Sequence, residues 1–192
     1  PLLLLKQTLQ ASYDPGPLLL DGPNVRFTSA EQFLSKVPGQ IATPHFTIMV
    51  EVEGSYSVKD IFSKRPKKTI ELVSTTFKDG QHEYVLHGKL THADILGSYP
   101  RCKEFMKVLS DSLPLENDKE ALAWKVVRTR CFFNLEIHRG GVTFWSMFPG
   151  TMPLQPSLPS EPYVRGLIHL PGLRGNPERI YKTTAIGPEF PG

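Results

Sequence analysis

Residues 131–145 read Cys-Phe-Phe-Asn-Leu-Glu-Ile-His-Arg-Gly-Gly-Val-Thr-Phe-Trp and carry the clearest strand pattern in the chain. The odd-numbered positions up to 137 are apolar or cysteine, whereas the even-numbered positions include Asn134, Glu136 and His138. A period of two with one apolar face is typical of a strand that is buried on one side. Gly140-Gly141 then supplies a turn before the apolar segment 142–145. This stretch therefore predicts an antiparallel hairpin.

Strand signals also occur upstream of this hairpin. Every second residue from Phe46 to Val52 is apolar, which predicts another half-buried strand. Asp79-Gly80 is a tight-turn signal between expected strands near residues 69–77 and 83–90. The expected fold class is α+β, with a largely antiparallel sheet, a buried N-terminal helix and short helices.

Helical spacing appears near the start of the chain and again near its middle. Pro1 suits a first helical turn, and Leu2, Leu5 and Leu9 follow at helical spacing. Because residues 3 and 4 are also leucine, we expect this helix to be buried on most sides. Residues 100–113 predict a second helix, with proline at its first position and Phe105, Val108 and Leu109 on one face.

Three further segments carry local signals. Thr28-Ser-Ala-Glu31 has the residues of a capping box and predicts a short helix that continues to residue 36. Residues 149–162 include five prolines and are expected to form a surface loop. Residues 167–170 are a short apolar run between Gly166 and Pro171-Gly172, which predicts a buried strand with an abrupt end.

The composition limits the class of protein. The 192 residues are 40% hydrophobic and 21% charged, with a net charge of +3, as expected for one ordinary globular domain. Cys102 and Cys131 lie far apart and form no C-x-x-C pair, which argues against a disulfide scaffold or a structural zinc site. A reducing, cytoplasmic location is therefore expected. Residues 2–5 are too few for a signal-peptide core or a membrane span, so no membrane partner is expected.

Basic residues form two candidate contact sites. The densest cluster lies in an expected loop at residues 59–68 and includes Lys59 and the candidate contacts Lys64, Arg65, Lys67 and Lys68. Such a loop binds phosphate by releasing counterions, or is simply solvated, and both interpretations stay open. Arg174 and Arg179 are expected in a stiff turn, where they either contact phosphate, nucleic acid or another domain, or brace the turn itself. Arg128, Arg130 and Arg139 flank the predicted hairpin and would extend a basic patch.

Other chemical signals are weak. His82, His87 and His92 recur every five residues, a spacing that does not converge on one face of a strand or a helix, so surface histidines are expected. Glu51 and Glu53 share a strand face in a manner similar to the E-x-E-x-K strand of triphosphate tunnel enzymes, but Ser55 replaces the lysine. We expect a solvated face there. The sequence contains no G-x-S-x-G and no P-loop.

Two segments resemble the ATP-binding heads of bacterial AAA ATPases of the ABC/SMC type, including Septu-like phage-defence ATPases. Residues 2–10 are similar to the leucine-rich helix that follows the P-loop, and Leu18-Leu-Leu-Asp-Gly-Pro23 is similar to the next segment. Residues 28–33 resemble the polar helix start after it. Residues 168–181 are similar to the family's Leu-Arg-Gly-x-Pro-x-Arg-x-Tyr pattern and include Arg174 and Arg179.

The resemblance implies an incomplete part of a P-loop NTPase head, lying between the Walker A and signature motifs. Residues 1–44 would be the helix and turn segment after the P-loop, and residues 45–192 the β-rich part of the same head. ATP and Mg²⁺ are implied cofactors of the parent protein. The chain alone is expected not to hydrolyse ATP, because Walker A, signature and Walker B motifs are absent from it.

The partners implied for the parent ATPase are a second copy of itself, as a homodimer or higher oligomer, an effector nuclease subunit and nucleic acid. The alternative hypothesis is a stand-alone β-rich module that binds an acidic or nucleic-acid partner through residues 59–68. Unlike the ATPase-head hypothesis, it predicts that the isolated chain unfolds cooperatively and that its association with a partner is sensitive to salt.

Overall fold

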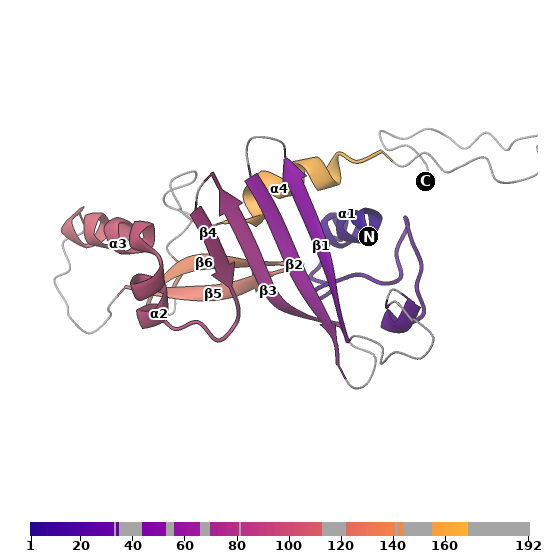
Figure 1. Ribbon diagram of the computed structural model, residues 1–192, viewed down its shortest axis with the longest axis horizontal. Helices are drawn as coiled ribbons and strands as arrows, with labels where there is room; N and C mark the ends of the chain where they lie inside the picture. The colour runs from indigo at the N-terminus through magenta and orange to yellow at the C-terminus, as the bar shows by residue number, and fades with distance from the viewer. Residues whose placement is uncertain are drawn as a thin grey trace, which may run out of the picture.

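The computed structural model describes residues 1–32, 34, 44–52, 56–65, 70–80, 82–112, 122–140, 142–143 and 155–168. Two antiparallel sheets and several short helices make up this part of the chain, which confirms the expected α+β class. Figure 1 shows the larger sheet in front of a long hairpin, with helices at both sides.

The larger sheet is an antiparallel meander in the order β1-β2-β3-β4. Its strands are β1 (His45–Val52), β2 (Tyr56–Lys64), β3 (Ile70–Asp79) and β4 (His82–Leu86). The alternating segment from Phe46 and the hairpin at Asp79-Gly80 are thus confirmed, and Gly80 has the positive φ of 58° that such a turn requires. The prediction of a loop at residues 59–68 is wrong for its first half, because β2 extends to Lys64.

The smaller sheet contains β5 (Ala123–Thr129), β6 (Phe132–Arg139) and β7 (Val142–Thr143), in that order. The hairpin predicted at 131–145 is confirmed as far as Thr143. Strand β5 was not predicted. Phe132 and Asn134, on the expected polar face, are also buried, because α4 (Ser157–Arg165) packs against β6 on that side of the hairpin.

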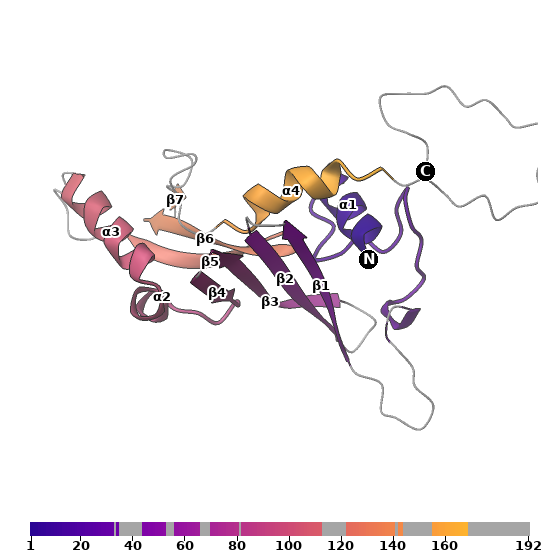
Figure 2. The ribbon, with the colours of Figure 1, turned by 45° about the horizontal axis from the view of Figure 1, so that its top comes forward.

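The N-terminal helix and the central helix are confirmed as α1 (Leu2–Gln10) and α3 (Pro100–Ser112). On α3 the buried residues are Cys102, Met106 and Leu109, whereas Val108 is 63% exposed, so the expected apolar face is only partly right. Between them lies α2 (His92–Ser98), which begins with a capping box formed by Thr91 and Asp94. Figure 2 shows α1 beside α4, at the end of the sheets away from α3.

Two expectations about the described C-terminal part are wrong. Residues 157–165 form α4 instead of a surface loop, with Pro159 in the first turn, where its missing N–H is not needed, and with Pro162 inside the helix. The expected strand at 167–170 is also absent from its described half: Leu167 is half-buried and Ile168 is 69% exposed. Residues 169–170 lie outside the described residues.

The capping box expected at residues 28–31 is replaced by other contacts. The described helix there is only the 3₁₀ turn η1 (Ala30–Gln32). The Thr28 N–H donates to the side chain of Gln32 over 2.9 Å, while Glu31 pairs with Lys64. The carboxylate of Glu31, which the local pattern predicted would cap the helix start, therefore forms a long-range ion pair instead.

The core lies between the two sheets and α1. The inner face of the meander contributes Ile48, Val58, Phe62 and Phe77, and the hairpin contributes Leu135 and Ile137. In the described part of the chain no helix is both long and apolar enough to cross a membrane.

Candidate functional site

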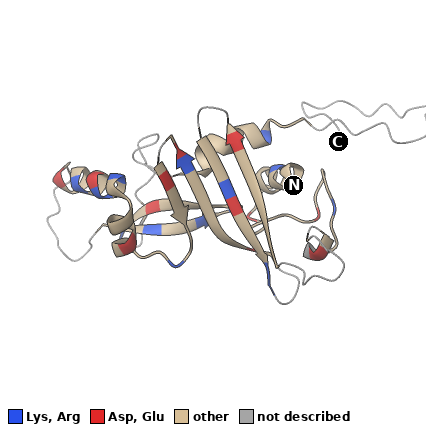
Figure 3. Ribbon diagram, viewed as in Figure 1, with Lys and Arg blue, Asp and Glu red and all other residues tan. Residues whose placement is uncertain are grey.

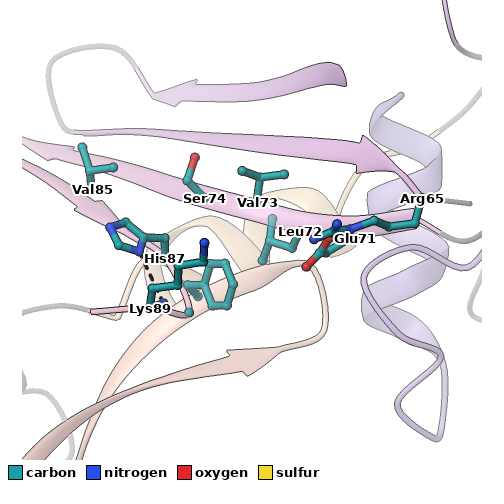
Figure 4. Close-up of a pocket in the computed structure, with 10 residues that line it drawn as sticks. Arg65, Glu71, Leu72, Val73, Ser74, Val85, His87 and Lys89 are labelled. Atoms are coloured by element: carbon teal, nitrogen blue, oxygen red, sulfur yellow. Dashed lines mark hydrogen bonds and ion pairs between the residues drawn. The ribbon is translucent and has the colours of Figure 1, made fainter. Parts of the chain in front are cut away.

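A cavity of about 640 Å³ lies against β3, next to the end of β4 (Figure 4). Its apolar wall is formed by Leu72 and Val73 of β3, Val85 of β4 and Phe133 of β6. Val73 and Val85 are 38% and 41% exposed, so this wall is open to solvent on its outer side. A hollow of this size accommodates a small ligand or a few side chains.

Charged side chains flank the same cavity. Figure 4 shows Arg65 and Glu71 at one end, with His87 and Lys89 at the other. Arg65 Nε donates to Glu71 Oε2, and this bond, together with the charge of Lys89, lowers the pKa of the Glu71 carboxyl from its usual value. Two permanent cations thus share one carboxylate, which leaves a positive excess for an incoming anion.

The strand at the cavity wall is irregular. The pairing of β2 with β3 shifts between Ile61 and Phe62, which face Ser74 and Leu72, so Val73 has no partner in this register. A bulge of this kind bends the strand and changes which side each residue faces. The alternation of buried and exposed residues is interrupted there, because Ser74 and Thr75 are both buried, while Val73 is exposed at the cavity.

The structure separates the two described candidate contacts of the basic cluster. Lys64 Nζ lies 2.5 Å from Glu31 Oε1, so it holds the η1 segment to the end of β2. Arg65, directly after it, belongs to the cavity instead. Lys67, Lys68, Arg174 and Arg179 lie outside the described residues, as does Glu53.

Acidic and basic positions are interspersed along the larger sheet rather than gathered on one face, as Figure 3 shows. Lys78 pairs with Glu83 and Arg101 with Asp79, each at 3.0 Å. The described part of the sheet therefore has local ion pairs in place of a continuous basic surface. The cavity differs from the sheet face in having two cations, Arg65 and Lys89, in its lining with Glu71 as the single carboxylate.

Two arginines expected to extend a basic patch bind the N-terminal segment instead. Arg130, in the turn between β5 and β6, donates to the carbonyl oxygens of Thr8, Leu9 and Ala11 at the end of α1. Arg128 pairs with both carboxylate oxygens of Asp14, at 2.6 and 3.2 Å. Because the C-terminal carbonyls of a helix lack intrahelical donors, Arg130 stabilises the end of α1, whereas Arg128 holds the segment that follows it.

A buried side chain joins α1 to residues 19–25. Gln7 is 1% exposed, and its carboxamide donates to the carbonyl oxygens of Leu19 and Val25. The same group accepts the backbone N–H groups of Asn24 and Val25. The carboxamide therefore satisfies four main-chain groups. Sequence periodicity does not predict this role, because a glutamine in a leucine-rich helix has no distinctive spacing.

A second buried polar chain links the two sheets. Asp60 of β2 is 2% exposed, and its carboxylate accepts the Thr75 hydroxyl over 2.6 Å. The Thr75 hydroxyl oxygen in turn accepts the Phe133 N–H of β6 over 2.9 Å. Burial raises the pKa of the Asp60 carboxyl well above its usual value, with the Thr75 bond acting in the opposite direction.

The three histidines occupy separate environments. His82 stacks on Tyr84, His87 lies at the cavity, and His92 Nδ1 accepts the backbone N–H of Trp124 over 3.0 Å. Within the described ranges no three or more His, Cys, Asp or Glu residues come together in a group that could hold a metal ion.

Comparisons of the chain with known protein families, with curated proteins and with solved structures found no match.

Proposed function

We propose that this chain is an interior part of an ATPase head of the ABC/SMC type. The observation that carries the proposal is the packing of two segments with family resemblance, residues 2–10 and 18–23, into one unit. Gln7 accepts and donates hydrogen bonds within residues 19–25, and the Thr8 hydroxyl accepts the Leu19 N–H over 2.9 Å. The antiparallel meander that follows agrees with the element types that the resemblance implies.

In this proposal the chain supports a nucleotide site rather than forming it. The described residues do not fit Mg²⁺-ATP by themselves, because they hold no cluster of metal ligands and the sequence lacks a P-loop. In this proposal α1 is the helix that the family resemblance places directly after the P-loop, and its contacts with residues 19–25 would hold it in position. Homodimerisation, an effector nuclease, nucleic acid and a role in antiviral defence belong to the same proposal.

The test is made on the natural polypeptide that contains these residues. Its intact mass and the peptide maps of both ends are measured first, followed by Mg²⁺-dependent ATP hydrolysis. We expect a Gly-Lys-Ser or Gly-Lys-Thr segment before Pro1, turnover by the longer polypeptide, and none by residues 1–192. A natural polypeptide without that segment, or turnover by residues 1–192 alone, would overturn the proposal.

A second candidate function is favoured by the cavity beside β3. We propose that it binds an acidic ligand, because Arg65 and Lys89 together exceed the charge of Glu71. Binding of an acidic probe should weaken with rising salt and in the variants Arg65→Gln and Lys89→Gln. Lys59→Gln removes a cation from β2 outside the cavity and serves as the matched control. Equal binding by all four proteins would contradict this function.

A further inference from the structure

We propose that residues 70–74 of β3 take an acidic peptide in extended conformation, added as a strand in line with β4. An acidic side chain of this peptide would enter the cavity between Arg65 and Lys89. The inference rests on the second proposed function, the binding of an acidic ligand at this cavity, and is independent of the ATPase proposal.

The first argument is the pairing of β3. Strand β2 pairs with β3 from Ile70 to Asp79, but β4 pairs only with residues 75–79. Among the described residues, no strand pairs with residues 70–74 on the side away from β2. Figure 1 shows β3 continuing past the end of β4. An unpaired edge presents N–H and C=O groups that can bind another extended chain.

The neighbouring edge of β4 is closed by a side chain. The Tyr99 hydroxyl donates to the Val85 carbonyl over 2.7 Å and accepts the Val85 N–H over 3.2 Å. It thereby takes both main-chain groups of Val85 that a further strand would use. Residues 70–74 have no corresponding side-chain cover among the described contacts, so strand addition is directed to β3.

The position of the cavity determines which side chains the bound peptide needs. Side chains of a strand alternate between its two faces, so every second residue of an added peptide would lie over the apolar wall at Val73 and Val85. The charged ends of the cavity, Arg65 and Lys89, would then receive carboxylates. A side-chain pocket beside a free strand edge is the combination that peptide-binding domains use for specificity.

Other anionic ligands fit fewer of these features. A small amphipathic anion would use the cavity and its cations but leave the edge of β3 unpaired. A nucleic-acid strand would use the cations and has no backbone N–H groups to pair with residues 70–74. The free edge therefore favours a peptide.

The experiment uses a fluorescent, end-blocked hexapeptide Glu-Ser-Val-Ser-Glu-Ser, in which both Glu side chains and the Val side chain share one face of the extended chain, with binding measured by anisotropy. Two matched peptides carry N-methyl groups on either the odd or the even backbone nitrogens. Because alternate N–H groups of a strand point to opposite edges, one methylated peptide should lose about tenfold in affinity and the other should bind normally. Amides within residues 70–74 should gain protection from hydrogen exchange on binding.

Protein variants distinguish strand addition at β3 from the binding of an acidic ligand in the cavity. Arg65→Gln and Lys89→Gln should weaken the unmethylated peptide, whereas Lys59→Gln should not. If both methylated peptides bind as well as the parent but still depend on Arg65 and Lys89, strand addition is overturned and the acidic-ligand function stands. If neither the peptide nor inorganic phosphate binds in a manner that depends on Arg65 and Lys89, both are overturned.

Discussion

The guanidinium of Arg130 lies 2.7 Å from the carbonyl oxygen of Ala11, directly after the last residue of α1. The two residues are 119 positions apart in the sequence. This contact fixes the β5–β6 turn to the N-terminal helix, and with Arg128–Asp14 it joins the start of the chain to the smaller sheet.

Replacement of Arg130 by glycine should destabilise the fold by about 1–3 kcal/mol, because the carbonyls at the end of α1 lose a charged donor. Glycine is the suitable substitute because Arg130 has φ of 55°, which glycine adopts without strain. The free energy of unfolding in urea measures the effect. Arg26→Ala removes an exposed arginine and should change it by less than about 0.5 kcal/mol. Equal stability of both variants would contradict this expectation.

Gln7 and Gly22 should be coupled in a double-mutant cycle. A Cβ at position 22 would lie 2.7 Å from Gln7 Cδ, so Gly22→Ala should be destabilising. Gln7→Ala should cost about 1–3 kcal/mol because it leaves buried main-chain groups of residues 19–25 without partners.

The double variant should lose less stability than the sum of the two single variants, because the shortened side chain at position 7 makes room for the new methyl group. Urea unfolding of all four proteins gives the coupling energy. Simple additivity would contradict the close contact.

Asp60 should make stability depend on pH. Its pKa is raised in the folded state, so the folded chain holds this proton more tightly than the unfolded chain. The contribution to stability is therefore greatest below the unfolded pKa of about 3.9 and falls as pH rises toward the folded pKa.

Asp60→Asn removes the titration and leaves an oxygen that can accept the Thr75 hydroxyl. Unfolding free energies of both proteins are compared between acid and neutral pH. The wild-type value minus the variant value should decrease as pH rises. A difference that is constant with pH would show that Asp60 titrates alike in both states.

Cys102 and Cys131 should react slowly with thiol reagents in the folded protein. Both are fully buried, and burial raises the pKa of Cys102 to about 12 and that of Cys131 well above its usual value. Because the thiolate is the reactive form, labelling should be complete only in denaturant. Rapid labelling of both thiols without denaturant would contradict the packing around α3 and β6.

The sequence by itself predicted the elements whose signals are local. The alternation from Phe46 to Val52, the Asp79-Gly80 turn, the leucines of α1 and the proline-started helix α3 all report main-chain preferences within about ten residues. Because these preferences act before any tertiary contact forms, they were recovered with small errors in their bounds. The mixed order of these elements also indicated the α+β class.

Tertiary structure decided what the same residues do. Lys64 and Arg65 are neighbours in one basic run, yet one pairs with Glu31 and the other lies at the cavity with Lys89. Asp60, Gln7 and Arg130 act through partners that are between 12 and 122 positions away in the sequence. Long-range pairings such as these depend on how the sheets stack, and sequence spacing carries no signal for that geometry.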